Sequence, residues 1–393
     1  MVHALAFEEG RVRYRNRFVL TAGLRADRRA GRTIYGELMD PITPDPKYVA
    51  PDGDPSPFKN VANTNVIRHA GRILALYEGG LPYELTLALE TKGLWDFAGK
   101  LEDTMTAHPK VDPETGEMLM FHYSFRPPFL VFSRADAKGS IVEQVPIETG
   151  MPYMVHDFSL TREHVIFFLC PVVFDMEGAK RGGPFLAWQP ERGTRMALLR
   201  RDGGGGVRWI EDEPYFVFHF MNAHEAEGRI TIDYVQHGAF FTAPGAPPAL
   251  WRAVLDPAAG TVKREALDDR IGEFPRADPA RAGAANRYGW LPVQTEKLPS
   301  GGFGALARYD FQSGAVAVHD FGPGREVDEP VFVPRPGASA ESEGWIMTYV
   351  YDRATDGSVC AILDAIDIAR PPAAEIILPR RVPHGLHGNW LPA

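Results

Sequence analysis

The chain has 393 residues, of which 45% are hydrophobic and 24% charged, an ordinary balance for a globular protein with a large buried core. Its formal net charge of −9 argues against nucleic-acid binding, because binding phosphates requires a basic face. The same charge gives no electrostatic reason to bind anionic lipid.

The cysteines and the N-terminus favour a reducing compartment. Cys170 and Cys360 are the only cysteines, and both lie in apolar runs, so we expect buried thiols rather than a disulfide framework. No apolar run is long enough to cross a bilayer. Residues 1–18 lack the charged-then-apolar pattern of a signal peptide. We therefore expect a cytoplasmic location.

Short apolar or alternating runs separated by turns follow one another along the whole chain. They are rich in β-branched and aromatic residues, which is typical of strands, and few segments keep a helical apolar period. The predicted strands lie at 72–77, 118–125, 129–133, 164–174, 215–223, 229–235, 250–256, 304–310, 315–321, 345–352 and 360–366. The sequence therefore predicts an all-β fold with scarce, short helices.

One hairpin turn recurs between these runs. Aspartate opens the turn, and a glycine four or five residues later is expected to close it at a positive φ. The turns are 112–116, 256–260, 310–314 and 352–357. Repeated hairpins favour a β-propeller over a large sandwich, and we expect residues 1–393 to form one domain. The irregular stretches 40–60, 176–206, 275–290 and 335–343 are predicted to be surface loops.

Four of the twelve histidines lie in distinctive surroundings: His108, His156, His219 and His387. They are too far apart in sequence for a zinc finger or a metal-binding helix, whose ligands lie close together. Their spacing suits a site on the axis of a closed repeat fold. On spacing alone, each is better explained as a hydrogen-bonded core histidine than as a ligand.

The sequence motifs around these histidines resemble those of the carotenoid cleavage oxygenase family, which includes stilbene-cleaving dioxygenases and the vertebrate retinoid isomerase. They occur in the family's order and cover nearly the whole chain. The matching strings are YRNRF (14–18), ANTNV (62–66), ALYEGGLPYEL (75–85), AHPKVDPETGE (107–117), VHDFSLT (155–161), FHFMNAHE (218–225), EFPR (273–276), EPVFV (329–333) and RVPHGLHGNW (381–390).

The resemblance implies a seven-bladed β-propeller with one Fe(II) per chain on its axis, beneath a cap of loops and short helices. It assigns the four iron ligands to His108, His156, His219 and His387. It makes Glu78, Glu273 and Glu329 the carboxylates that contact those ligands, and it places Thr64 beside the oxygen-binding position. Family members have a longer N-terminal stretch, so we also expect that an N-terminal strand is missing.

This donor set suits oxygen chemistry. Four neutral imidazoles leave the Fe(II) with its full charge, unlike the triad of two histidines and one carboxylate found in many Fe(II) oxygenases. A glutamate can accept the second ring N–H of a histidine, which fixes the tautomer and raises the basicity of the ligand. Without the resemblance, the three glutamates would be assigned to the solvent-exposed surface.

The resemblance predicts oxidative cleavage of a C=C double bond by O₂ to give two carbonyl products. Stilbene cleavers of the family bind a phenol with a lysine and a tyrosine, and Tyr77 and Leu38 stand at the matching positions here. Losing both polar groups favours an apolar conjugated substrate, an apocarotenoid or carotenoid. Tyr77, Leu38 and Phe274 are the expected pocket residues.

Three alternatives remain open at this stage. They are a stilbene or phenylpropenoid cleaver on the same site, an inactive propeller that only binds ligands, and a zinc hydrolase, for which no nucleophile motif is present. Weak contact with a membrane surface during substrate uptake is also expected. Of the other histidines, His224 and His384 lie close to ligands in sequence and are expected to be pocket neighbours, while the rest are read as surface or strand residues.

Overall fold

The structure is a computed structural model that describes residues 1–36, 42–49, 53–102, 104–241 and 243–392. The chain divides into two compact units. Unit 1 comprises Met1–Val111, Thr115–Met154 and Val172–Ala187. Unit 2 comprises Asp112–Glu114, Val155–Pro171 and Trp188–Ala393. The expectation of a single domain stays a prediction.

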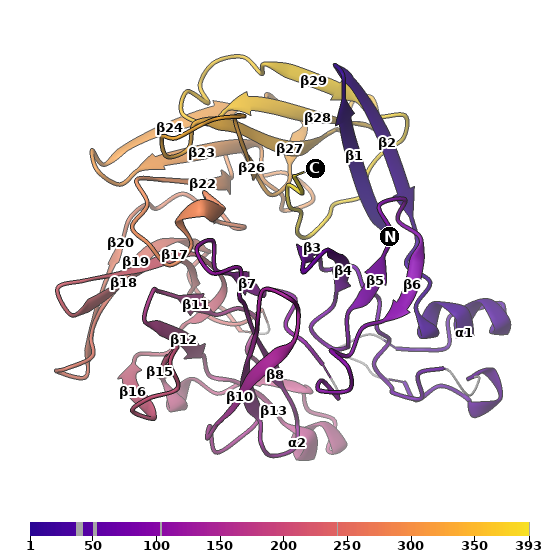
Figure 1. The fold of residues 1–393 in the computed structure, drawn as a ribbon, viewed down its shortest axis with the longest axis vertical. Coiled ribbons are helices and arrows are strands. Elements are labelled where there is room, and N and C mark those ends of the chain that lie inside the picture. Colours follow the sequence, from indigo (N-terminus) through magenta and orange to yellow (C-terminus); the bar gives the residue numbers. More distant parts are fainter. Residues whose placement is uncertain (37–41, 50–52, 103, 242, 393) are drawn as a thin grey trace. The chain divides into compact units, whose positions relative to one another are not determined.

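Unit 1 contains two antiparallel four-stranded sheets and two strand pairs. The hairpin at the N-terminus joins β1 (Val2–Glu8) and β2 (Arg11–Arg17) (Figure 1). The first sheet holds β3 (Asn65–His69), β4 (Arg72–Leu76), β5 (Tyr83–Leu85) and β6 (Thr91–Leu94). The second holds β7 (Lys110–Val111), β8 (Met118–Tyr123), β9 (Leu130–Ala135) and β10 (Ile141–Ile147), and the last pair is β13 (Val172–Phe174) with β14 (Leu186–Trp188).

Helices are short and have recognisable caps. In α1 (Ala22–Ala30), the hydroxyl of Thr21 accepts the N–H of Leu24, and Gly31 ends the helix at φ +67°. In α2 (Met176–Lys180), the side chain of Asp175 accepts the N–H of Gly178. Three 3₁₀ turns complete the helical structure of the described residues: η1 (Pro46–Tyr48), η2 (Pro190–Arg192) and η3 (Pro279–Arg281).

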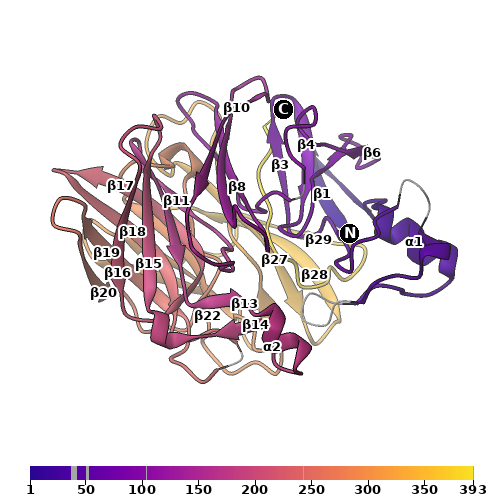
Figure 2. The same ribbon diagram turned by 90° about the horizontal axis from the view of Figure 1, so that it is seen from below.

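Unit 2 contains four antiparallel sheets. The first holds β11 (Ser159–Leu160), β12 (His164–Leu169), β15 (Thr194–Arg200) and β16 (Val207–Asp212). The second holds β17 (Phe216–Ala226), β18 (Arg229–His237), β19 (Ala249–Asp256) and β20 (Thr261–Ala266), which Figure 2 shows side by side. The third holds β21 (Arg276–Ala277), β22 (Tyr288–Val293), β23 (Ala305–Asp310) and β24 (Ala315–Asp320). The fourth holds β25 (Arg325–Val327), β26 (Val331–Pro334), β27 (Gly344–Asp352), β28 (Gly357–Asp364) and β29 (Ala374–Ile377).

Apolar side chains between the last two sheets of unit 2 form a core. Trp290 of β22 is fully buried, and its ring stacks on Phe332 of β26 with centroids 5.6 Å apart. Its indole N–H donates to the carbonyl of Ala365 at 3.0 Å, so the polar atom of this large side chain is satisfied. The core therefore fixes β26, which directly follows the loop that carries Glu329.

The predicted hairpin turns are confirmed, with one difference. The carboxylate of Asp256 accepts the N–H groups of Ala258 and Ala259, and Gly260 closes that turn at φ +68°. In the longer turn 352–357, Asp356 takes the positive φ of +47° instead of the glycine. The extra residue moves the left-handed position one place earlier, and aspartate tolerates that conformation better than most residues.

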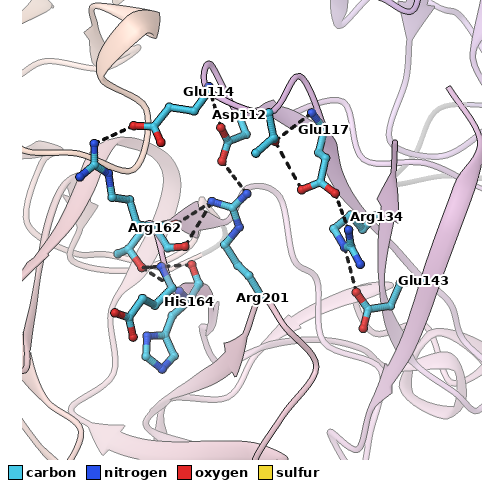
Figure 3. Close-up of polar contacts among 11 residues, drawn as sticks. Asp112, Glu114, Glu117, Arg134, Glu143, Arg162, His164 and Arg201 are labelled. Atoms are coloured by element: carbon cyan, nitrogen blue, oxygen red, sulfur yellow. Dashed lines mark hydrogen bonds and ion pairs between the residues drawn. The ribbon is translucent and has the colours of Figure 1, made fainter. Parts of the chain in front are cut away.

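Ion pairs hold the turn that follows His108. Within unit 2, Arg201 Nη2 lies 2.5 Å from Asp112 Oδ2, and Arg162 Nη2 lies 2.7 Å from Glu114 Oε1 (Figure 3). The Arg201–Asp112 pair is well shielded, because these side chains are only 12% and 11% exposed. The Arg162–Glu114 pair is exposed and should contribute little to stability.

Three expectations about the strands need correction. The described residues form six sheets of four or five strands, not the seven expected blades, because β1 and β2 pair only as a two-stranded hairpin. The run 164–174 splits at Pro171 into β12 and β13, since proline lacks the N–H that a continuous strand needs. The predicted loop 176–206 contains β15, whose buried apolar residues are flanked by arginines.

The cap and the missing N-terminal strand stay predictions. Both cysteines are free and buried, as expected. In the part of the chain that is described, no helix is long and apolar enough to span a membrane.

Candidate metal centre

His219 lies within β17 and is held by a buried carboxylate. Its Nδ1 lies 2.7 Å from Oε2 of Glu273, and both residues are less than 10% exposed. Burial raises the pKa of a carboxylic acid, but the facing His219 and His237 outweigh burial and hold the pKa of Glu273 well below its usual range. An ionised Glu273 can only accept, so Nδ1 of His219 donates, and in the neutral imidazole Nε2 then keeps its lone pair for a metal.

The backbone after Glu273 has an unusual conformation. Phe274 has φ +60°, which is uncommon for a large side chain and is found mainly where function requires it. In this conformation its N–H donates to the carboxylate of Glu273. Its ring stacks on His219 with centroids 5.2 Å apart and lies 5.5 Å from the ring of His387. Phe274 thus places an apolar surface against two candidate ligands.

His387 comes from an irregular C-terminal segment that is fixed by hydrogen bonds. The N–H of Val382 donates to the hydroxyl of Ser358 at 2.9 Å. Nδ1 of His387 lies 2.9 Å from Oε1 of Glu329, and the N–H of Gly388 donates to Oε2 at 2.9 Å. These contacts leave Nε2 of His387 as its remaining ring nitrogen.

Arg276 compensates the charge of Glu329. Its Nη1 lies 3.2 Å from Oε1 of Glu329, and its Nη2 donates to the side-chain oxygen of Asn389 at 2.9 Å. Burial raises the pKa of Glu329, but Arg276 and His387 outweigh it and hold this pKa at about 2. Glu329 is therefore ionised at neutral pH and, like Glu273, acts as an acceptor.

His156 completes a cluster of three histidines within unit 2. Its Nε2 lies 3.3 Å from Nε2 of His219. The ring centroid of His219 is 5.0 Å from that of His156 and 4.8 Å from that of His387. Two imidazole nitrogens this close are favourable only when a shared proton or a cation lies between them. A lone pair on Nε2 of His219 could accept the N–H of His156 or bind a metal ion, so the cluster is compatible with a metal site.

Unit 1 carries His108 and three other predicted site residues. The N–H of His108 donates to Thr106 at 3.0 Å, and His108 is 6% exposed. Oε1 of Glu78 accepts the hydrogen bond of the Tyr123 hydroxyl at 2.9 Å.

The predicted oxygen-site and pocket residues of unit 1 are Thr64 and Tyr77. Thr64 is buried, and burial raises the pKa of Tyr77 to about 12. Leu38 lies outside the described residues.

Within unit 2, the ring nitrogens of His156, His219 and His387 form a cluster that could hold a metal ion, and His108 of unit 1 is the fourth predicted ligand. All four are neutral nitrogen donors, which are suited to a borderline transition metal such as iron or zinc and not to calcium or magnesium. The clustered histidines fit a metal-binding group, while the full ligand set and the identity of the metal stay predictions.

A second group of possible ligands consists of Glu163, His164 and Glu225. Its charges already have partners. Glu225 accepts from Nδ1 of His164 at 2.8 Å and from the hydroxyl of Thr161. Arg200 Nη1 lies 3.7 Å from Glu163, whose side chain is 61% exposed. We therefore interpret this group as an ion-pair network.

Sequence reasoning missed several residues that hold the cluster. His237, read as an ordinary strand histidine, lies 3.0 Å from Oε1 of Glu273. Arg276 stands in the EFPR motif, which gives no sign of its contact with Glu329. Conversely, the expected pocket neighbour His384 pairs with Glu326 at 3.0 Å and is 43% exposed. His224 is half-buried in β17, and neither of these two histidines belongs to the four-histidine group.

A profile of the RPE65 family, described as retinal pigment epithelial membrane protein, matches residues 1–392. The chain belongs to this family, the carotenoid cleavage oxygenases. It is 33% identical to isoeugenol monooxygenase of Pseudomonas nitroreducens over 100% of this chain and 86% of the relative. It is 32% identical to apocarotenoid-15,15'-oxygenase of Synechocystis over 99% of this chain and 84% of the relative.

Solved structures of the family are similar throughout. The crystal structure of Pseudomonas brassicacearum lignostilbene dioxygenase matches with a TM-score of 0.91 and 32% identity, covering 99% of this chain and 86% of the other. Cobalt-substituted Synechocystis ACO matches with a TM-score of 0.86 and 30% identity, covering 98% of this chain and 85% of the other. The carotenoid cleavage oxygenase described here is thus an all-β protein of the β-propeller type and an oxidoreductase that uses O₂. Its family acts on small apolar substrates.

Proposed function

We propose that this oxygenase uses one Fe(II) ion to cleave a C=C double bond of an apolar conjugated substrate, an apocarotenoid or carotenoid, into two carbonyl products. His108, His156, His219 and His387 would hold the iron. The observation that carries the proposal is the pair of buried carboxylate–imidazole contacts, Glu273 with His219 and Glu329 with His387. Each leaves a fixed ring nitrogen for the metal.

The protein's own groups would set the ligand field and the polarity of the site. When bound, ferrous iron supplies electrons to O₂, which otherwise reacts slowly with an alkene. The imidazoles add no charge, so the metal keeps its double positive charge. Glu273 orients the ring of His219, and Glu329 orients the ring of His387. We propose that Glu78 likewise orients a histidine of the same ligand set. Phe274 excludes water from one side of His219 and His387.

The apolar substrate class is supported by the pocket candidates. Tyr77 stands where stilbene cleavers of the family have a lysine, so an uncharged phenol takes the place of a cation there. Phe274 offers an aromatic face beside the histidine cluster. We assign both to substrate contact, Thr64 to the oxygen-binding position, and Leu38 to the pocket wall.

A phenylpropenoid or stilbene substrate is the second candidate. It is favoured by the similarity to isoeugenol monooxygenase and by 33% identity to resveratrol cleavage oxygenase 1 of Aspergillus fumigatus over 99% of this chain. A hydroxylated aromatic substrate would need a polar partner for its phenol, because an unpaired buried hydroxyl costs about 1–3 kcal/mol.

The substrate class can be tested directly. The enzyme, reconstituted with Fe(II) without air, is mixed with an apocarotenal, resveratrol or isoeugenol in the presence of O₂, and carbonyl products are identified by mass spectrometry. We expect aldehydes from the apocarotenal and slow or no cleavage of the two phenols. Rapid cleavage of a phenol alone would assign the enzyme to the second candidate. Aldehydes absent from every reaction would contradict the proposed activity.

A further inference from the structure

Glu273 has two histidine partners, one on each oxygen. Oε2 lies 2.7 Å from Nδ1 of His219, and Oε1 lies 3.0 Å from Nε2 of His237. The N–H of Phe274 also donates to Oε2. All four residues belong to unit 2, and the side chains of His219, Glu273 and His237 are only 10–12% exposed. The carboxylate is thus bound by three donors in a site with little access to water.

The second carboxylate of the cluster, Glu329, has an arginine where Glu273 has His237. Glu329 contacts His387 and is compensated by the permanently charged Arg276 at 3.2 Å. At Glu273 the corresponding position is taken by an imidazole instead of a guanidinium. Each carboxylate that contacts a candidate ligand in unit 2 therefore has a further nitrogen donor behind it, with a different chemistry in each case.

His237 is itself firmly placed. It is the last residue of β18 and pairs in register with Phe216 of β17. Its ring packs edge-on against Phe218 with centroids 5.2 Å apart. The next residue, Gly238, has no room for a side chain, because a Cβ there would lie 2.3 Å from the backbone nitrogen of Ala246. The close approach of these two segments ends the strand and directs the His237 side chain.

We propose that His237 is a positioning residue that locks the carboxylate of Glu273 and, through it, the ring of the metal ligand His219. The inference rests on the proposed function. With its Oε1 bound by His237, Glu273 cannot rotate about its terminal bond or exchange its two oxygens. His219 therefore meets one acceptor in one plane. Without the donor on His237, a buried carboxylate oxygen loses its partner, and the ring of His219 loses its fixed orientation.

Metal binding by full-length protein tests this. Metal-free native protein and the variants His237→Leu, His237→Gln and His319→Leu are titrated with Co(II) without air, and affinity and the visible Co(II) spectrum are recorded. Glutamine places an amide N–H near the position of imidazole Nε2, so it should restore the contact. His319, half-buried in β24 beside Phe321, is a matched control because it has no contact with Glu273 among the described residues.

We expect His237→Leu to weaken Co(II) binding by about 3- to 10-fold, less than the roughly 10- to 100-fold typical for losing a direct carboxylate partner of a ligand. Its Co(II) spectrum should shift, and His237→Gln should return both readouts most of the way to native. His319→Leu should bind like native. The melting temperatures of the metal-free variants identify any loss that comes from unfolding alone.

The outcomes separate the inference from the proposed function. If native protein binds Co(II) and His237→Leu gives the same affinity and spectrum, the inference is wrong and the four-histidine site stands. If His237→Leu and His237→Gln lose binding equally, the donor contact is not what matters, and the inference is again overturned. If native protein binds no metal, the proposed function fails, and the inference fails with it.

Discussion

The carboxylate of Asp157 accepts the backbone N–H of Phe220 at 3.1 Å, which joins the segment carrying His156 to the strand carrying His219. Its other oxygen accepts the N–H of Phe158 at 2.8 Å. Asp157 directly follows His156, and its buried side chain therefore fixes Phe220, the residue after His219. It also binds the N–H of the next residue, Phe158.

Replacing Asp157 should loosen both histidines. Asp157→Ala removes two acceptors from buried N–H groups, and each unsatisfied donor costs about 1–3 kcal/mol. We expect the free energy of unfolding to fall by roughly 2–4 kcal/mol, measured by urea denaturation of metal-free protein. Asp157→Asn keeps one acceptor oxygen and should lose less. Native-like stability of Asp157→Ala would show that these hydrogen bonds are not needed.

Asn222, in the motif that follows His219, should matter for stability and not for chemistry. Its side-chain amide donates to the carbonyls of Arg281 and Ala284 and to Asn286, and its oxygen accepts from Gly283. We expect Asn222→Ala to lower the free energy of unfolding by about 2–4 kcal/mol, since several partly buried partners lose their bonds.

Asn16 provides the control for this prediction. It is a half-buried strand asparagine that donates one hydrogen bond, to the hydroxyl of Tyr14 at 3.1 Å. Asn16→Ala should therefore change the unfolding free energy by at most about 1 kcal/mol. If the two alanine variants were equally stable, the role given to Asn222 would be wrong. Thermal and urea unfolding would both report the difference.

The stability of the fourth sheet of unit 2 should depend on pH through His384. The hydrogen bond to Asp328 and the charge of Glu326 raise the pKa of His384 above its ordinary value of 6.5. Because the folded pKa is the higher one, this stabilisation is complete below pH 6.5 and is lost as the pH rises through the folded pKa. Arg353 and Ser300 also contact Glu326, so its charge keeps partners throughout.

The variant His384→Gln isolates that dependence. The difference in unfolding free energy between native protein and His384→Gln should be larger at about pH 6 than at about pH 9, in metal-free protein. A difference that stays constant, or that grows toward high pH, would mean that the protonated imidazole does not stabilise the fold.

Local sequence pattern predicted most strands and the hairpin turns, because alternation and turn residues act over a few positions. It failed where contacts with residues distant in the sequence determine whether a segment forms a strand. The pattern predicts a loop where β15 lies, although the apolar residues of β15 are buried between β12 and β16. The number of blades was wrong because it came from the resemblance, whereas the described residues give β1 and β2 only each other as partners.

The ligands were found through their motifs, but the residues behind them were not. His237 lies in a run that reads as an ordinary strand, and nothing near it in sequence points to Glu273. Arg276 contacts Glu329, and Asp157 contacts Phe220, across more than fifty residues of chain. Such contacts depend on the packing of sheets and leave no local signal. One signal was available for His237: it lies just after a predicted strand next to the predicted strand that carries His219.

The iron content of the protein tests the central claim most directly. Native protein, reconstituted with Fe(II) without air and freed of loose metal, should hold about one iron per chain, and His219→Ala should hold little or none after the same treatment. His319→Ala should match native protein. Iron bound by His219→Ala as tightly as by native protein would contradict the four-histidine site.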